Sequence, residues 1–162
     1  MPNLTGAQIA EYFQRSYTAV DGLWFMKLEE KYGFEAALEI DREVWRVFPK
    51  IQARKLKSIL GKEQGLSALA ECLTAKHTLE SFTFATEFDS QATVFKLIIT
   101  QCPWYDLMRN SGRKHLANKV GRVICNTEYP VWAGEFGAGI RFELQSQLCD
   151  GSASCILQFS QS

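Results

Sequence analysis

The sequence lacks a net charge and a long apolar run. Lysine and arginine together number 18, as do aspartate and glutamate, so the 162-residue chain is formally neutral at pH 7. A neutral chain has no overall attraction for nucleic acid or for an anionic membrane surface, and we expect neither as a partner. The longest apolar run, around residues 94–99, contains Lys96 and is far too short to span a bilayer.

Targeting and nucleotide-binding motifs are also missing. Residues 1–14 show no basic region followed by an apolar stretch, so we expect no signal peptide. Five cysteines, an odd number, in a chain without an export signal are typical of reduced thiols and indicate a cytoplasmic protein. Phosphate-loop, dinucleotide, zinc-protease and Gly-x-Ser-x-Gly motifs do not occur, which removes the commonest enzyme signatures.

Apolar content is high enough for a substantial core. Hydrophobic residues make up 46% of the chain and aromatic residues 12%. The length suits one domain, residues 1–162, because no repeat or linker interrupts it. Within it we distinguish a helical subregion, 1–78, from a sheet-bearing, cysteine-containing subregion, 79–162.

Helical periodicity dominates the first half. Thr5 is a good N-cap for a helix ending near Ala19, and Asp21 is a good start for a second helix that stops at Gly33. The remaining helices are expected at 34–60 and 66–75. Pro49 should kink or split the first of these, because proline has no N–H for the preceding turn.

Alternation with period two appears in the second half. Residues 82–88 and 94–99 predict one hairpin, and residues 140–148 and 155–159, joined by Asp150–Gly151, predict another. Helices are expected between them at 103–110, 112–125 and 131–138. The predicted fold is therefore α+β, with a helical N-terminal half packed on a four-stranded antiparallel sheet made of two hairpins separated by helices.

Four cysteines lie near the ends of these elements: Cys102, Cys125, Cys149 and Cys155. Four thiolates could hold zinc, or alternatively iron or an iron–sulfur cluster. Their spacing is not that of a zinc knuckle, and free cysteine is commonly a small buried hydrophobe, so this alternative stays open.

Cys102 has a second possible role as a nucleophile. If Pro103 begins a helix, the helix dipole should lower the pKa of the thiol. His115 is the candidate base in the same segment, although it could equally be a solvated surface histidine.

Asp41, Glu128 and three tryptophans are further candidates. Asp41 interrupts an apolar helical stripe and is either a pocket acid or a salt-bridge partner. Glu128 could be a metal ligand, a base or an ordinary loop acid. Aromatic walls for a small-molecule site could come from Trp24, Trp45 and Trp132, which could also be core residues.

The residues also resemble known families. The stretch from Asp21 through Phe25, the run Glu29 through Ala37, and Asp41 through Trp45 are similar to the helical half of proteins described as L-2-amino-thiazoline-4-carboxylic acid hydrolase-like. The second half resembles 4-vinyl-reductase-like domains, which are related in fold to heme nitric-oxide sensors and trafficking-complex subunits. That likeness rests on Cys102-Pro103-Trp104, Cys125, and Cys149-Asp150-Gly151 leading to Cys155 and Phe159. The resemblance implies that the four cysteines lie together.

Three functional hypotheses follow. The first is a cytoplasmic metal-binding or small-molecule-sensing domain that uses cysteines of the C-terminal half, with zinc as the expected metal. The second is a hydrolase that opens a thiazoline or amide ring at a C–N bond of a cyclic amidine or amide, with Cys102 or a metal-bound water as nucleophile and Glu128 or Asp41 as base. The third is a structural dimerisation module, and in any case we expect a homodimer.

Overall fold

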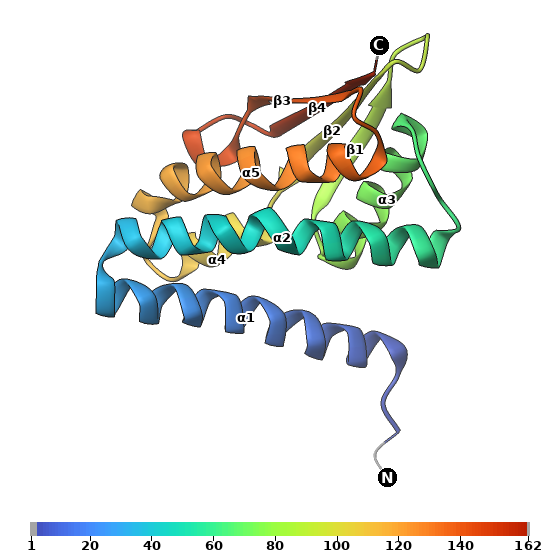
Figure 1. The fold of residues 1–162 in the computed structure, drawn as a ribbon. Coiled ribbons are helices and arrows are strands. Elements are labelled where there is room, and N and C mark those ends of the chain that lie inside the picture. Colours follow the sequence, from blue (N-terminus) through green and yellow to red (C-terminus); the bar gives the residue numbers. More distant parts are fainter. Residues whose placement is uncertain (1–2, 162) are drawn as a thin grey trace. The chain divides into compact units, whose positions relative to one another are not determined.

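The computed structural model describes residues 3–161 and has the predicted α+β architecture (Figure 1). The chain divides into two compact units, Met1–Asp41 and Arg42–Ser162, and the division falls inside one long helix. Within the described residues, no helix is both long and apolar enough to cross a membrane.

The first unit contains helix α1, Gly6–Tyr32, and the start of α2, Phe34–Leu60. Thr5 caps α1 as predicted: its side chain accepts from the Gln8 N–H at 3.2 Å, and the Gln8 side chain accepts from the Thr5 N–H at 2.9 Å. The predicted break near Asp21 is wrong, because α1 continues through this position as one helix. It ends at Gly33, whose φ of 88° suits glycine.

The second unit holds the rest of α2, the helices α3, α4 and α5, and the sheet. The bounds are α3 Leu66–Leu79, β1 Thr83–Phe88, β2 Val94–Gln101, α4 Pro103–Asn110, α5 Lys114–Phe136, β3 Ile140–Ser146, the short 3₁₀ helix η1 Leu148–Asp150, and β4 Cys155–Gln161. Pro49 does not split α2. The two helices expected at 112–125 and 131–138 are one helix, α5, which contains Pro130.

The sheet consists of the two predicted hairpins, joined through their inner strands in the order β1-β2-β4-β3. All neighbouring strands are antiparallel, and Phe95 lies opposite Phe159, Leu97 opposite Leu157, and Ile99 opposite Cys155. These six side chains face the core, which explains the period-two pattern of the sequence.

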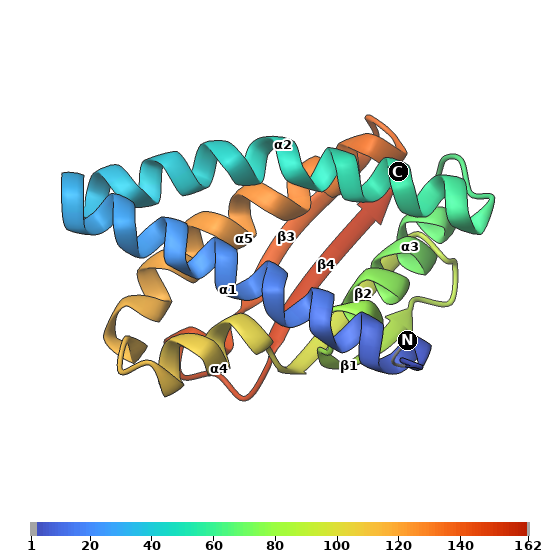
Figure 2. The same cartoon turned by 90° about the horizontal axis from the view of Figure 1, so that it is seen from below.

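Helices α3 and α5 supply the other side of this core. Leu69 and Leu73 of α3 and Trp132, Ala133 and Phe136 of α5 are almost fully buried in the same apolar cluster as the inner strands. Figure 2 shows the elements from below, with α2 beside α5. The α2–α5 pair is tied by Arg54, whose guanidinium donates two hydrogen bonds to the Glu135 carboxylate at 2.9 and 3.0 Å.

Candidate functional site

A pocket lies between α2 and α5 in the second unit. Its volume is about 450 Å³. Two residues of α2 and four of α5 line it: Arg42, Arg46, Val123, Asn126, Thr127 and Val131. Two guanidinium groups therefore face a helix surface that is partly apolar and partly polar, and none of the six lining residues is acidic.

The local geometry of each helix explains this lining. Arg42 and Arg46 are one turn apart on α2, so their side chains lie on one face. On α5, Thr127 Oγ1 donates to the Val123 carbonyl at 2.7 Å, and the Asn126 amide donates to the Arg122 carbonyl at 2.8 Å. These bonds to the helix backbone hold both polar side chains against α5.

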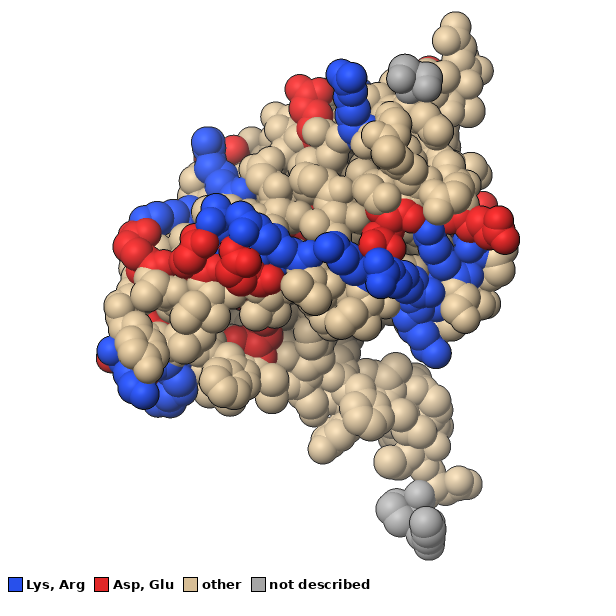
Figure 3. Space-filling model, in the orientation of Figure 1, with Lys and Arg blue, Asp and Glu red and all other residues tan. Residues whose placement is uncertain are grey.

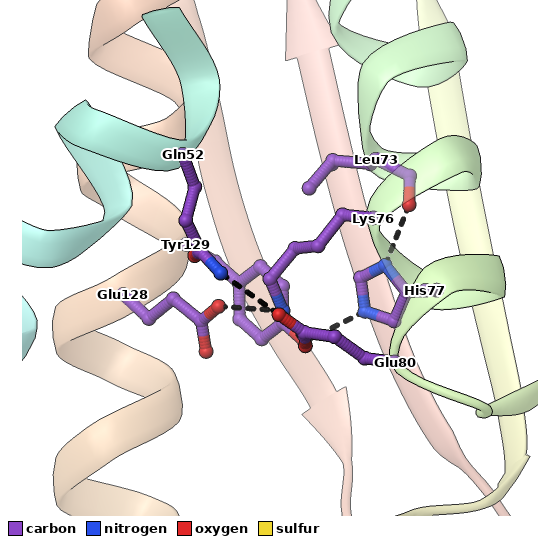
Figure 4. Close-up of polar contacts among 7 residues, drawn as sticks. All are labelled: Gln52, Leu73, Lys76, His77, Glu80, Glu128 and Tyr129. Carbon is purple, nitrogen blue, oxygen red and sulfur yellow. Dashed lines mark hydrogen bonds and ion pairs between the residues drawn. The ribbon is translucent and has the colours of Figure 1, made fainter. Parts of the chain in front are cut away.

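A buried ionic cluster joins α2, α3 and α5 (Figure 4). Lys76 Nζ lies 2.9 Å from Glu80 Oε2 and 2.8 Å from Glu128 Oε1, and the Gln52 amide donates to Glu80 Oε1 at 2.8 Å. The lysine side chain is 2% exposed and the Glu128 side chain 7%. One buried cation thus faces two carboxylates, so the cluster has an excess negative charge when both are ionised.

The pKa values follow from this arrangement. Burial alone would lower the pKa of Lys76, but Glu128 and Glu80 outweigh it and hold that pKa above its usual value. Burial raises the pKa of Glu128, and Lys76 opposes the rise. Lys76 is therefore an ammonium ion at neutral pH and not a nucleophile.

His77 lies beside the ionic cluster and is fully buried. Its Nδ1 is 2.7 Å from the Leu73 carbonyl oxygen and its Nε2 is 3.0 Å from the Tyr129 hydroxyl. Because a carbonyl only accepts, Nδ1 carries the hydrogen, and Nε2 accepts from Tyr129. Burial lowers the pKa of His77, which keeps the ring neutral. Both ring nitrogens are engaged, so the histidine orders the core and is not available as a base.

Cys125 lies on α5, and Cys102, Cys149 and Cys155 are near enough to affect the pKa of its thiol. Burial raises the pKa of Cys125, and repulsion from the Glu128 carboxylate, and from Cys102, Cys155 and Cys149 when these are ionised, raises it further. Cys149 lies against α5 one turn earlier, where a Cβ added to Gly121 would be only 2.8 Å from its sulfur. The Cys155 sulfur accepts from the Leu148 N–H at 3.2 Å.

The zinc assignment stays a prediction. Within residues 3–161, no group of three or more histidine, cysteine, aspartate or glutamate side chains is arranged to hold a metal ion. Zinc ligation would also require the buried thiols to lose their protons, because the ligand is thiolate. We expect protein purified without chelator to contain about one zinc per chain by elemental analysis. A content far below one metal per chain would contradict the assignment.

The expected low pKa of Cys102 is wrong. Cys102 does occupy the N-cap of α4, and the Tyr105 and Trp104 backbone N–H groups do favour its thiolate. Burial is the larger effect and raises the pKa of the thiol to about 12. The candidate base His115 is exposed near the start of α5.

The other predicted site residues have varied positions. Glu128 is a buried residue of α5, so of its three predicted roles that of an ordinary loop acid is wrong. Trp132 is fully buried and stacks on Phe136 at 6.2 Å, while Trp45 makes edge contacts with Phe48 and Trp104. Asp41 and Trp24 belong to the first unit. None of these five residues lines the α2–α5 pocket, and their roles at a site stay predictions.

Sequence reasoning missed Lys76, His77 and both pocket arginines. A signal for the first two exists: they follow Leu66, Leu69 and Leu73 on the apolar face of α3, where a lysine and a histidine are out of place. No comparable signal marks the pocket, because it depends on how α2 and α5 pack.

Most of the chain matches the model of one protein family. This is DUF6125, a family of unknown function, and the match covers residues 5–154. The chain belongs to this family. A search of curated proteins finds no match.

Two solved structures share the fold. One is a trafficking protein particle complex subunit 3 from Naegleria fowleri covalently bound to palmitic acid, with a TM-score of 0.57, 9% identity, and coverage of 94% of this chain and 96% of that one. The other is the phenol-responsive sensory domain of the transcription activator PoxR with phenol, with a TM-score of 0.52, 16% identity, and coverage of 88% and 73%. At these identities the likeness establishes the fold alone.

Proposed function

We propose that the protein is a small-molecule-binding domain whose ligand occupies the pocket between α2 and α5. The pocket itself carries the proposal. Its volume, about 450 Å³, lies within the range of about 300–1,000 Å³ that is common for small-molecule sites. Val123 and Val131 supply apolar surface, and Arg42 and Arg46 supply the few directional polar groups that orient a ligand.

The rigidity of the surroundings supports a preformed site. Arg54 and Lys57 of α2 both bond to Glu135 of α5, through its carboxylate and its backbone carbonyl respectively. The ionic cluster adds a second tie, from Gln52 of α2 to Glu80 at the end of α3. A pocket whose walls are fixed before binding loses less entropy when a ligand enters.

The fold neighbours add independent support for a sensing role. The PoxR domain is described as phenol-responsive, and the trafficking subunit was solved with palmitic acid. A fold that holds organic molecules in other proteins makes a ligand-sensing role in this chain a natural hypothesis, although fold alone does not fix function.

Binding should be detectable as thermal stabilisation. At a ligand concentration 100 times the dissociation constant, a bound ligand stabilises the folded state by about 2.7 kcal/mol. We expect at least one member of a panel of phenol, 3-phenylpropionate, 3-phenylpropanol and palmitate to raise the melting temperature.

A variant that fills the pocket tests whether the probes bind there. Thr127→Trp places an indole in the pocket and should abolish the shift, while Lys55→Trp, on an exposed position of α2 outside the pocket, should leave it intact. If no probe stabilises the protein, or if Thr127→Trp binds as well as Lys55→Trp, the proposed function is wrong.

The hydrolase and dimerisation alternatives stay predictions. A thiol with a pKa of about 12 is protonated at neutral pH, which argues against Cys102 as the nucleophile. Turnover of an aminothiazoline carboxylate by the purified protein would restore the hydrolase hypothesis.

A further inference from the structure

Positive charge is concentrated on the C-terminal part of α2. The whole chain is neutral, yet residues 42–60 contain six lysines and arginines and a single acidic residue, Glu43. Figure 3 shows the Lys and Arg side chains as a band across the middle of this face, over α2. Residues 42–60 are therefore basic within a chain that has no net charge, whereas the first turns of α2 contain Glu35, Glu39 and Asp41.

The two ends of the basic segment differ in their neighbours. Toward the C-terminal end, Glu135 of α5 accepts from Arg54 and lies near Lys57 and Lys50, which together hold the pKa of that carboxyl below its usual value. At the pocket end, Arg42 and Arg46 face four residues of α5 that carry no charge. The α5 wall thus balances the positive charge at one end and not at the other.

Glu43 does not cancel the charge at the pocket. It pairs with Arg46 on the same helix, but both side chains are about half exposed, at 55% and 48%. Exposed pairs of this kind contribute little and exchange readily with other partners. The guanidinium of Arg46 can therefore turn to a ligand anion, which it binds through two parallel N–H groups.

We propose that the ligand of this pocket is an organic anion, a carboxylate or a phosphate ester, whose charged group is held by Arg42 and Arg46. The apolar body of the ligand lies against Val123 and Val131, on the opposite wall. The inference rests on the proposed function, because it names the class of ligand for the same pocket. A cationic ligand would face two guanidinium groups without a compensating carboxylate on the pocket wall.

Matched pairs of probes test the inference by titration calorimetry. The pairs are 3-phenylpropionate with 3-phenylpropanol, and phenyl phosphate with phenol, so that only the charged group changes. We expect at least one anion to bind about tenfold or more tightly than its neutral partner, as charge-assisted hydrogen bonds predict. The preference should shrink as salt rises from 0.15 to 0.5 M.

Variants that remove a positive charge show which residues cause the preference for the anionic probe. Arg46→Gln should remove most of it, and because Arg46 is an exposed helix residue this variant should fold normally. Arg42→Gln should have a similar effect. Lys55→Gln removes the same charge from an exposed position of α2 outside the pocket and should preserve the preference.

The outcomes separate the two proposals. Equal binding of anion and neutral partner, or a preference that survives in both Arg46→Gln and Arg42→Gln, would overturn the anion inference. If these probes still lose binding in Thr127→Trp, the pocket itself stands. If no probe binds at all, both the pocket and its ligand class are wrong.

Discussion

Replacement of Lys76 by methionine should be the most destabilising change in the ionic cluster. Methionine fills a similar volume but leaves Glu80 and Glu128 facing each other without a cation, 2.9 and 2.8 Å from where the ammonium was. Removing one partner of a buried ion pair costs about 3–5 kcal/mol, because an uncompensated charge stays in the core. Chemical unfolding would measure this loss against Lys55→Met, an exposed control on α2.

The stability lost in Lys76→Met should increase as the pH rises. Burial already raises the pKa of Glu128 above 4.5, and Lys76 is the main group that opposes this rise. Without Lys76 the pKa of Glu128 rises further, so this carboxyl binds a proton more tightly in the folded state than in the unfolded state. A carboxyl of this kind destabilises the fold as pH increases from 4.5 through its folded pKa. The deficit of Lys76→Met should therefore be smaller near pH 4 than near pH 8.

A second substitution checks the cause of the loss. Glu128→Gln in the Lys76→Met background removes one of the two carboxylates and should recover a large part of the lost stability at pH 8. If Lys76→Met is no less stable than Lys55→Met, or if its deficit is the same at both pH values, the ionic cluster is not the source of this stability.

Gly121→Ala should destabilise the protein although alanine is the better helix former. The added Cβ would lie 2.8 Å from the Cys149 sulfur, a distance that real contacts do not allow, so either the Cys149 side chain must rotate or α5 and η1 must move apart. Inserting a methyl group into a packed interface costs about 1–3 kcal/mol. The expected result is a lower midpoint of denaturation.

Gly134→Ala is the matched control in the same helix. This glycine is exposed, and an added Cβ would meet nothing within 4 Å. The substitution should stabilise the protein by up to about 1 kcal/mol, through helix propensity alone. Cys149→Ala should rescue Gly121→Ala, because it removes the clashing sulfur. Equal effects of the two glycine substitutions would contradict the close approach of Cys149 to α5.

The sheet could be predicted from sequence because its signals are local. Phe95, Leu97 and Ile99 alternate with less buried residues, and one buried face is enough to fix both strand and register. Cys102–Pro103 likewise marks the start of α4, since proline suits the first turn of a helix.

Helix boundaries were less predictable because packing overrides local preference. The sequence predicts two separate helices, at 112–125 and 131–138, and Pro130 between them costs about 3 kcal/mol inside a helix. Trp132 and Phe136, which follow it, are fully buried in the core, and their burial offsets that cost when α5 continues. Local signals carry no information about this gain, so the prediction of a break failed.

The candidate site, like the fold, could be predicted from the sequence only in part. That Cys102, Cys125, Cys149 and Cys155 lie together is implied by a resemblance rather than by their spacing, and a site made of these four thiols stays a prediction. The pairing of His77 with Tyr129 could not be predicted, because 52 residues separate them and only the packing of α3 against α5 brings them together. The pocket depends on the packing of α2 against α5 and is invisible in the sequence.

Contacts between a probe and the pocket valines test the central claim most directly. The measurement is a set of intermolecular nuclear Overhauser effects from 3-phenylpropionate and from phenol to assigned methyl groups of the protein. We predict cross-peaks from at least one probe to the methyl groups of Val123 and Val131, which face the pocket from α5. Cross-peaks only to methyl groups elsewhere, or none from either probe at saturating concentration, would contradict a binding site between α2 and α5.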